Sequence, residues 1–340
     1  MPPSVENMSQ DTQHPAIRTQ ALTRHFTRHK QTVEAVRGLD LEVAPGDLVA
    51  FLGPNGAGKS TTLRMLTTLI APTSGTAEVA GYDVVRHQRD VRRSIGYVGQ
   101  GNAAAHQQRG RDELVSQARA HGMSRADSRR RADELLEAFD LADHGGRPVS
   151  TLSGGQRRRL DIAIGLVHTP RLLFLDEPST GLDPQNRLNL QEQVKRLHTE
   201  HGTTIVLTTH YLEEADAIAD RVVVIDHGLV IADDTATGLK SGLGDLVTLN
   251  FASTEEATVG AQRAGRLAAD VALDDSVVTI RTPGGAELAP GLVQDLAVAG
   301  APVRRIEVVG PTLDDVFLDL TGRSLRESID QTTPTEGAAA

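Results

Sequence analysis

Uninterrupted apolar runs alternate with helix-like patterns along the first two-thirds of this chain. The runs are Leu48–Leu52, Leu172–Leu175 and Ile205–Thr209, and their length is typical of strands buried on both faces of a sheet. Helix-like patterns follow them, with apolar residues three, four or seven positions apart, which indicates helices with one buried side. Buried strands that alternate with helices predict an α/β core with a mostly parallel sheet.

Other strands and helices are predicted around this core. Ile17–Phe26 and the alternating residues 39–43 predict two strands near the N-terminus, and Thr76–Val79 with the turn after it predicts a short hairpin. From about Asp112 to Phe139 the pattern is helical and heavily charged. Further strands are predicted at residues 94–98 and 222–225, and further helices at about 160–167, at 185–198 and between 210 and 222.

After about residue 241 the predicted order becomes β, α, β, β, α, β, which is that of a split βαβ, ferredoxin-like α+β domain. A last helix is predicted from Thr312, because Asp315 follows three residues later as in a capping box. Its apolar side is Leu313, Val316, Phe317 and Leu320. The six elements before it are Leu246–Phe251, about Glu255–Leu267, a strand near Val271, Val277–Thr282, Leu292–Ala299 and Val303–Val309.

The composition changes to glycine, lysine and serine at about residues 237–244, where we place a domain boundary. We therefore predict one domain at residues 17–240 and a smaller accessory or regulatory domain at 241–325. The segments 1–16 and 326–340 are predicted to be disordered tails, because they are polar and lack periodic apolar residues.

Composition narrows the classes of protein. The chain has no cysteine, which excludes disulfides and cysteine metal sites. No apolar run approaches the ~18 residues of a membrane span, and no leader-like segment opens the chain, which together fit a cytosolic protein. A net charge of −10 and 3% aromatic residues argue against nucleic-acid binding, which needs a basic surface and stacking side chains.

A glycine-rich loop stands between the first apolar run and its helix. Glycines let successive backbone N–H groups turn inward toward phosphate oxygens, and the helix start adds its positive end. Lys59 can reach the β- and γ-phosphates, and the Ser60 hydroxyl can bind Mg²⁺. An ordinary glycine turn before a helix is the alternative, but strand, loop, Lys-Ser and helix are all present. The loop is Gly53-Pro54-Asn55-Gly56-Ala57-Gly58-Lys59-Ser60-Thr61.

Polar side chains follow three other predicted strands, at the edge where parallel strands end beside the phosphates. Asp176 can hold Mg²⁺ through water, and Glu177 can act as the general base on an attacking water. His210 can order the γ-phosphate and that water, and Gln100 can reach the metal. Each of these residues has a plain structural alternative, namely a solvated carboxylate, a structural histidine or a surface glutamine.

A second candidate phosphate site opens a later helix at Ser153-Gly154-Gly155-Gln156. A hydroxyl and bare backbone N–H groups at a helix start bind anions. Two such sites in one chain could serve two ligands, or they could close on one ligand from two copies of the chain. The residues alone leave both alternatives open.

Taken together, these motifs resemble the ATP-binding subunit of an ABC transporter over about residues 17–240. The resemblance implies a P-loop NTPase domain with a mostly parallel sheet, an antiparallel β subdomain and a helical subdomain. The segment Pro311–Leu318 resembles the C-terminal domain of daunorubicin-resistance type exporter ATPases. The motifs in chain order are GPNGAGKST, Gln100, LSGGQ, LLFLDEP, Gly181-Leu182-Asp183 and His210.

The resemblance implies a role for each candidate residue. Gly53–Thr61 would be the Walker A loop, Asp176 the Walker B aspartate, Glu177 the catalytic base, Gln100 the Q-loop glutamine and His210 the switch histidine. Ser153–Gln156 would be the signature that contacts the γ-phosphate of ATP held by the other subunit.

Two further positions complete the set that the resemblance implies. Asp183 would be the D-loop aspartate, which works across a dimer. Phe26 stands where the family usually has a tyrosine that stacks on adenine; it keeps the aromatic face and loses the hydroxyl, and the alternative is a core phenylalanine. One departure is the stretch after Gln100, GNAAAHQQRGRDEL, which is more polar than in related chains, where this region touches the membrane partner.

The expected function is therefore ATP hydrolysis with Mg²⁺ that powers export of a hydrophobic, antibiotic-like small molecule. The expected partners are an integral membrane permease of the ABC-2 type and a second copy of the chain, bound head to tail at the cytoplasmic face of the membrane, with no nucleic acid. One alternative is a non-transport ABC ATPase that acts on ribosomes or DNA. Another is a drug-sequestering protein whose ATPase is regulatory.

Overall fold

The computed structural model describes residues 14–28, 31–101, 104, 107–266 and 270–325. The tail predicted at 326–340 and all but the end of the one predicted at 1–16 lie outside the described residues, as does part of the polar stretch after Gln100. The chain divides into two compact units, one up to Asp233 and one from Asp234.

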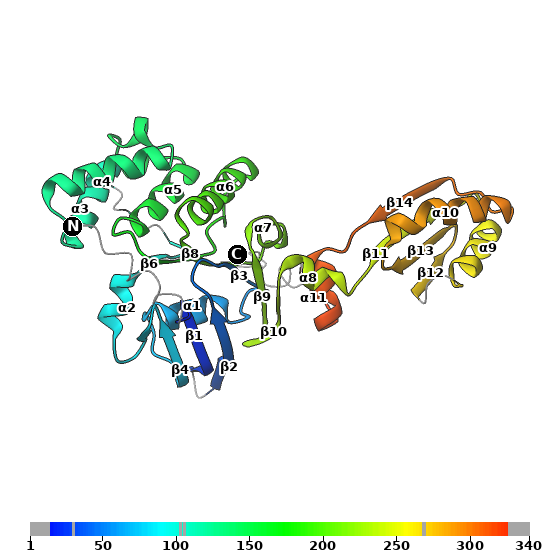
Figure 1. The fold of residues 1–340 in the computed structure, drawn as a ribbon, viewed down its shortest axis with the longest axis horizontal. Coiled ribbons are helices and arrows are strands. Elements are labelled where there is room, and N and C mark those ends of the chain that lie inside the picture. The colour runs from blue at the N-terminus through cyan, green and yellow to red at the C-terminus, as the bar shows by residue number, and fades with distance from the viewer. Residues whose placement is uncertain (1–13, 29–30, 102–103, 105–106, 267–269, 326–340) are drawn as a thin grey trace, which may run out of the picture. The chain divides into compact units, whose positions relative to one another are not determined.

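A six-stranded sheet forms the centre of the first unit, in the order β10-β9-β3-β8-β7-β6 (Figure 1). Strand β3 pairs in parallel with β8 and β9, and β7 pairs in parallel with β6 and β8, so the predicted mostly parallel sheet is confirmed. All five residues of β3 and of β7 are buried, as their uninterrupted apolar sequences predict. The strands are β3 (Leu48–Leu52), β6 (Ile95–Val98), β7 (Leu172–Asp176), β8 (Thr204–Thr209), β9 (Arg221–Asp226) and β10 (Leu229–Asp234).

A second, antiparallel sheet has the order β2-β1-β4-β5. Helix α1 (Lys59–Leu66) contacts β2 and β4 of this sheet and β7 of the central sheet. Its side chains Leu63, Met65 and Leu66 are buried in the core that the two sheets share. The strands are β1 (Ile17–Arg28), β2 (Gln31–Val43), β4 (Ser74–Val79) and β5 (Tyr82–Asp83).

Helices α3, α4, α5 and α6 cover the side of the central sheet away from the antiparallel strands, whereas α2 contacts β5 of the antiparallel sheet (Figure 1). The charged stretch predicted from about Asp112 to Phe139 is divided into two helices, because Gly122 between them has a φ of +89° and takes the chain out of the helix. Within the described residues, none of the helices is both long and apolar enough to span a bilayer. The helices are α2 (Gln88–Ser94), α3 (Gly110–Ala120), α4 (Arg125–Ala138), α5 (Gly154–Gly165), α6 (Pro184–His201) and α7 (Leu212–Ile218), with short 3₁₀ turns at Ala142–His144 and Val149–Thr151.

The second unit contains a four-stranded antiparallel sheet in the order β12-β13-β11-β14. Helix α9 packs against β12 and β13, and α10 packs against β11 and β14, around one apolar core. This arrangement confirms the ferredoxin-like prediction. The elements are α8 (Ala236–Ser241), β11 (Asp245–Asn250), α9 (Thr254–Ala264), β12 (Asp270–Asp274), β13 (Val277–Thr282), α10 (Gly285–Val298), β14 (Arg305–Val309) and α11 (Leu313–Thr321).

The last helix, α11, begins as predicted. The Thr312 hydroxyl accepts a hydrogen bond from the backbone N–H of Asp315, and the Asp315 carboxylate accepts one from the N–H of Thr312, which completes a capping box. Three of the four predicted apolar residues are buried, whereas Leu320 is 44% exposed. The helix packs against α8 of the same unit.

Candidate active site

The loop between β3 and α1 borders a cavity of about 180 Å³. Only glycine fits at Gly58, because its φ is +108° and a Cβ there would lie 2.5 Å from the Ala35 carbonyl oxygen. The loop therefore keeps a tight curve with its backbone close to β2. The cavity is lined by Asn55, Gly56, Ala57, Gly58, Lys59, Ser60, Thr61, Gln100 and Glu177.

Lys59 lies at the start of α1 and is buried. Its Nζ donates hydrogen bonds to the carbonyl oxygens of Gly53 at 2.6 Å and Pro54 at 3.0 Å. Burial lowers the pKa of Lys59 to about 8, although the nearby carboxylates of Glu177 and Asp176 act in the opposite direction. The loop thus holds one desolvated cation beside the cavity, where a phosphate would be a stronger partner than two carbonyls.

Asp176 ends β7 and is fully buried. Its Oδ1 accepts hydrogen bonds from the Ser60 hydroxyl at 2.7 Å and from the Thr208 hydroxyl at 2.8 Å. Its Oδ2 has no hydrogen-bond partner among the described residues. Gln100 Nε2 lies 3.3 Å from Ser60 Oγ, so three side chains expected at a metal are in one place.

The oxygen atoms of this group fit Mg²⁺, which prefers oxygen ligands and usually keeps several waters and phosphate oxygens. A buried carboxylate oxygen without a partner is costly unless a ligand satisfies it. In the part of the chain that the structure describes, no group of three or more His, Cys, Asp or Glu side chains is arranged to hold a metal ion. A metal held mainly by ATP and water does not require one.

Glu177 and His210 face each other beside the cavity. The His210 Nδ1 lies 3.5 Å from Glu177 Oε2, and both side chains are nearly buried. The His210 imidazole lowers the pKa of Glu177, and Lys59 and the Thr180 hydroxyl act in the same direction against the effect of burial. The backbone of Glu177 is left-handed, with a φ of 46°, which is strained for a residue with a side chain.

The signature residues Ser153–Gln156 do not line the phosphate cavity. Ser153 caps α5: its hydroxyl accepts from the N–H of Gln156, and the Gln156 side chain accepts from the N–H of Ser153. Ser153 and Gly154 are exposed, whereas a Cβ on Gly155 would lie 2.2 Å from Asn186 Oδ1. The exposed helix start is therefore open to a ligand from outside this unit.

Asp183 caps α6 in a similar way, because its carboxylate accepts a hydrogen bond from the N–H of Asn186 at 3.0 Å. This bond is the main reason that the pKa of Asp183 lies below its ordinary value. Asp183 also does not line the phosphate cavity. The starts of α5 and α6 are thus capped and exposed, and both lie outside the phosphate cavity.

Phe26 lies near the end of β1 and is 38% exposed, so the alternative that it is a core residue is wrong. The Arg24 guanidinium lies over its ring, 4.6 Å from the centroid. Arg24 Nη1 donates to the Ala71 carbonyl oxygen at 2.8 Å, which fixes the guanidinium. A stacking partner could use the ring on its other side.

Relatives cover nearly the whole chain. The ABC transporter family profile matches residues 36–180. A daunorubicin resistance ATP-binding protein of Streptomyces coeruleorubidus, DrrA3, is 44% identical over 303 residues, which are 86% of this chain and 93% of that protein. The linearmycin resistance ATP-binding protein LnrL of Bacillus subtilis is 33% identical over 302 residues, 88% of this chain and 96% of that protein. This chain belongs to the ABC transporter family of ATP-binding proteins.

The fold of this ABC ATPase agrees with solved structures. The ATP-binding cassette MJ0796, solved as a dimer in a post-hydrolysis state with ADP and Pi, is 25% identical with a TM-score of 0.60. It covers 64% of this chain, and the match includes 98% of the solved chain. The α/β P-loop ATPase fold, ATP binding and ATP hydrolysis thus follow from the family.

Sequence reasoning missed a buried side chain that holds the backbone around the candidate site together. Arg158 of α5 is buried, and its guanidinium donates to the carbonyl oxygens of Gly99 at 2.7 Å, Pro178 at 2.8 Å and Asp176 at 3.1 Å. It lies in a run of three arginines, which is typical of a solvent-exposed charged segment. The helical spacing could have indicated that Arg158 is buried, because it shares a helix face with the buried residues Gly155 and Ile162.

Proposed function

We propose that this ABC ATPase powers the export of a hydrophobic, antibiotic-like small molecule through a separate integral membrane permease of the ABC-2 type. The observation that carries the proposal is that relatives named for resistance to daunorubicin and linearmycin match both compact units of the chain. The ATPase would act at the cytoplasmic face of the membrane and bind no nucleic acid.

The residues of the cavity suit phosphoryl transfer to water. The backbone N–H groups of Asn55–Thr61 would bind the phosphates, and Lys59 would exchange its two carbonyl partners for phosphate oxygens. Ser60, Asp176 and Gln100 would hold Mg²⁺, directly or through water; when bound, Mg²⁺ supplies positive charge that offsets the phosphate charge. Glu177 would accept the proton of the attacking water.

His210 would keep Glu177 ionised and in place, and could donate a hydrogen bond to the γ-phosphate. Because its pKa is already lowered, Glu177 stays a carboxylate throughout the neutral range. Positioning and electrostatics then supply most of the catalysis.

A head-to-tail homodimer would complete the site. The exposed Ser153 and Gly154 are open to a γ-phosphate held by the loop of a second copy, and Asp183 would contact that copy. Phe26 would stack on adenine with the face that Arg24 leaves open. Closing and opening of this dimer would move the permease.

The test is to purify the tagged chain from detergent-solubilised membranes and to identify what accompanies it. We expect a polytopic membrane protein in about equal amount. Ribosomal or DNA-bound material, with nothing from the membrane, would refute export and leave the ATPase assignment intact. An untagged strain is the control for carry-over.

A further inference from the structure

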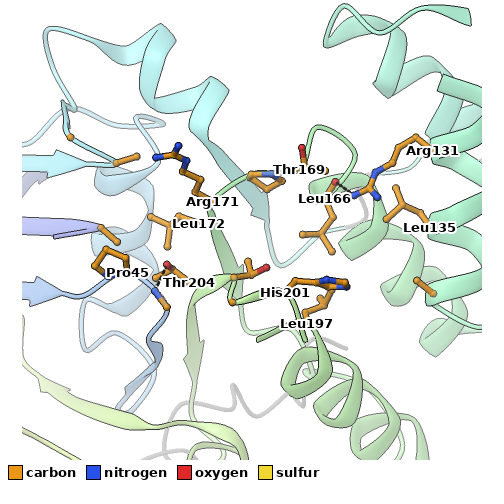
Figure 2. Close-up of a pocket in the computed structure, with 18 of the residues that line it drawn as sticks. Pro45, Arg131, Leu135, Leu166, Thr169, Arg171, Leu172, Leu197, His201 and Thr204 are labelled. Atoms are coloured by element: carbon orange, nitrogen blue, oxygen red, sulfur yellow. Dashed lines mark hydrogen bonds between the residues drawn. The ribbon is translucent and has the colours of Figure 1, made fainter. Parts of the chain in front are cut away.

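A second cavity, of about 640 Å³, lies in the first unit (Figure 2). Apolar side chains form much of its wall: Leu135 of α4, Phe139 directly after α4, Leu166 after α5, Leu172 of β7 and Leu197 of α6. None of its lining residues also lines the phosphate cavity. Leu172 is the first residue of β7, so this cavity lies at the sheet edge opposite to the one that carries Asp176.

Basic side chains dominate the titratable groups of this cavity. Arg131, Arg171, His14 and His201 line it, and Glu134 is the one carboxylate among its described lining residues. Glu134 is already engaged, since Arg131 lies 3.4 Å from one of its oxygens and Arg130 lies 3.6 Å from the other. Arg131 also donates to the Leu166 carbonyl oxygen at 2.9 Å, which fixes its guanidinium (Figure 2). With the histidines neutral, Arg131 and Arg171 against Glu134 leave one net positive charge at the rim, in a chain with a net charge of −10.

We propose that this cavity is a binding site for a small amphipathic organic anion. Cavities of roughly 300–1,000 Å³ with apolar walls and a few convergent polar groups are typical of small-molecule sites. The apolar body would replace water against the leucine and phenylalanine walls, and the acidic group would lie at the rim near Arg131 and Arg171. This proposal stands independently of the exported substrate.

Two strands connect this cavity to the phosphate site of the same chain, and two helices connect it to the exposed helix starts that the proposed dimer would use. Strand β7 starts at the cavity and ends at Asp176, and β8 starts at Thr204 of the cavity and ends just before His210. Helices α5 and α6 start at the caps Ser153 and Asp183 and end at the cavity. A ligand that fits the cavity differently in the ATP-bound and free states would therefore change ATP affinity, and ATP would change ligand affinity by the same factor.

The binding test uses 1-anilinonaphthalene-8-sulfonate, an apolar anion whose fluorescence rises when it leaves water, with the full chain. Ala138 lines the cavity from an exposed position on α4, so Ala138→Trp would fill it. We expect saturable binding that Ala138→Trp weakens at least about tenfold. Ala126→Trp, at an exposed position of the same helix that does not line the cavity, should leave the affinity unchanged. Equal affinity in both variants would overturn the site.

The charge of the ligand is tested separately. N-phenyl-1-naphthylamine has the same aromatic body without the sulfonate, so we expect it to bind at least about tenfold more weakly. Arg171→Glu should weaken sulfonate binding more than Arg129→Glu, an exposed charge reversal on α4 outside the cavity. Equal binding of the two probes would refute an anion site. Tighter probe binding after deletion of residues 1–13 would mean that this segment, rather than a ligand, occupies the cavity.

Coupling to the nucleotide site is tested by ATP hydrolysis with and without saturating probe. We expect the wild-type kcat/KM for ATP to change about fivefold or more, and that of Ala138→Trp to stay constant. A change that persists in Ala138→Trp would place the probe at the nucleotide site and would overturn the coupling. Thermal melting of each variant shows that it is folded.

Discussion

At the scale of single residues, Lys59 carries the clearest pH dependence. Its pKa is lowered to about 8, so the unliganded enzyme loses this cation as the pH rises through about 8 and keeps it below that value. We expect kcat/KM for ATP to fall above about pH 8. The fall in kcat should occur at a higher pH than the fall in kcat/KM, because bound phosphate favours the charged form of the Lys59 amine.

Steady-state pH profiles check this expectation, since kcat/KM reports on the free enzyme and kcat on the complex. A kcat/KM that stays level up to the ordinary lysine pKa of 10.5 would contradict the proposed role of Lys59.

Glu177 gives the second residue-scale prediction. Glu177→Gln removes the proposed base but keeps the shape, so ATP should still bind while kcat falls by about 100-fold or more. The MgATP-bound dimer should then accumulate. Light scattering with saturating MgATP measures it, with the wild-type chain as the control. If only monomer is present, the head-to-tail dimer is wrong for this chain in isolation.

The sequence predicts which residue types stand at strand ends, but not how they are connected. Asp176, Glu177 and His210 were found because each follows a predicted buried strand. Thr208 was missed, although it donates to Asp176 and accepts from the N–H of Glu177. That contact depends on the register of β7 and β8, which place Asp176 beside Thr208, and register is set by tertiary structure.

At the scale of elements, α5 joins several parts of the site through one side chain. Arg158→Met removes a buried donor and leaves the carbonyl groups of Gly99, Asp176 and Pro178 without it. We expect a loss of about 3 kcal/mol in the free energy of unfolding, together with a lower kcat, because the backbone at Glu177 is no longer held.

Urea unfolding and ATPase assays measure both effects. Arg157→Met is the matched control, because each hydrogen bond of Arg157 is 3.4 Å long and the side chain is only partly buried. It should cost about 1 kcal/mol or less. Equal losses in the two variants would refute the connecting role of Arg158.

Long periodic elements were predicted better than short or irregular ones. Strands β3 and β7 and helix α6 lie where their patterns place them. Helix α10 was predicted to start at Leu292, but it begins at Gly285 and continues through Pro290. Short elements such as α2 and β10 were missed: α2 has a single apolar residue, Val91, and β10 is only six residues long, with its apolar residues in one run and not in alternation.

At the scale of the whole molecule, helix α11 tests the prediction that the second unit is a regulatory domain. Helix α11 buries Leu313, Val316 and Phe317, contacts α8 and pairs Asp315 with Arg281 of β13 at 3.2 Å, so it has partners within its own unit. We expect deletion of residues 311–340 to lower the thermal stability, because it exposes these apolar residues.

Leu320→Asp separates stability from docking, because Leu320 is 44% exposed. We expect it to leave the melting temperature, the MgATP-dependent dimer and the kcat unchanged. Analytical ultracentrifugation of this variant with MgATP measures the dimer. A weakened dimer would instead show that α11 is a contact surface, as a regulatory domain requires.

The left-handed backbone at Glu177 has a consequence for the history of this chain. A side chain in this conformation costs about 1–2 kcal/mol, which glycine does not incur and asparagine incurs less. With Glu177 as the proposed base, selection for hydrolysis would be what keeps a carboxylate at position 177. In a duplicated gene whose product no longer needs to hydrolyse ATP, a change of residue 177 to glycine would stabilise the fold. The residue at position 177 would therefore distinguish descendants that hydrolyse ATP from those that do not.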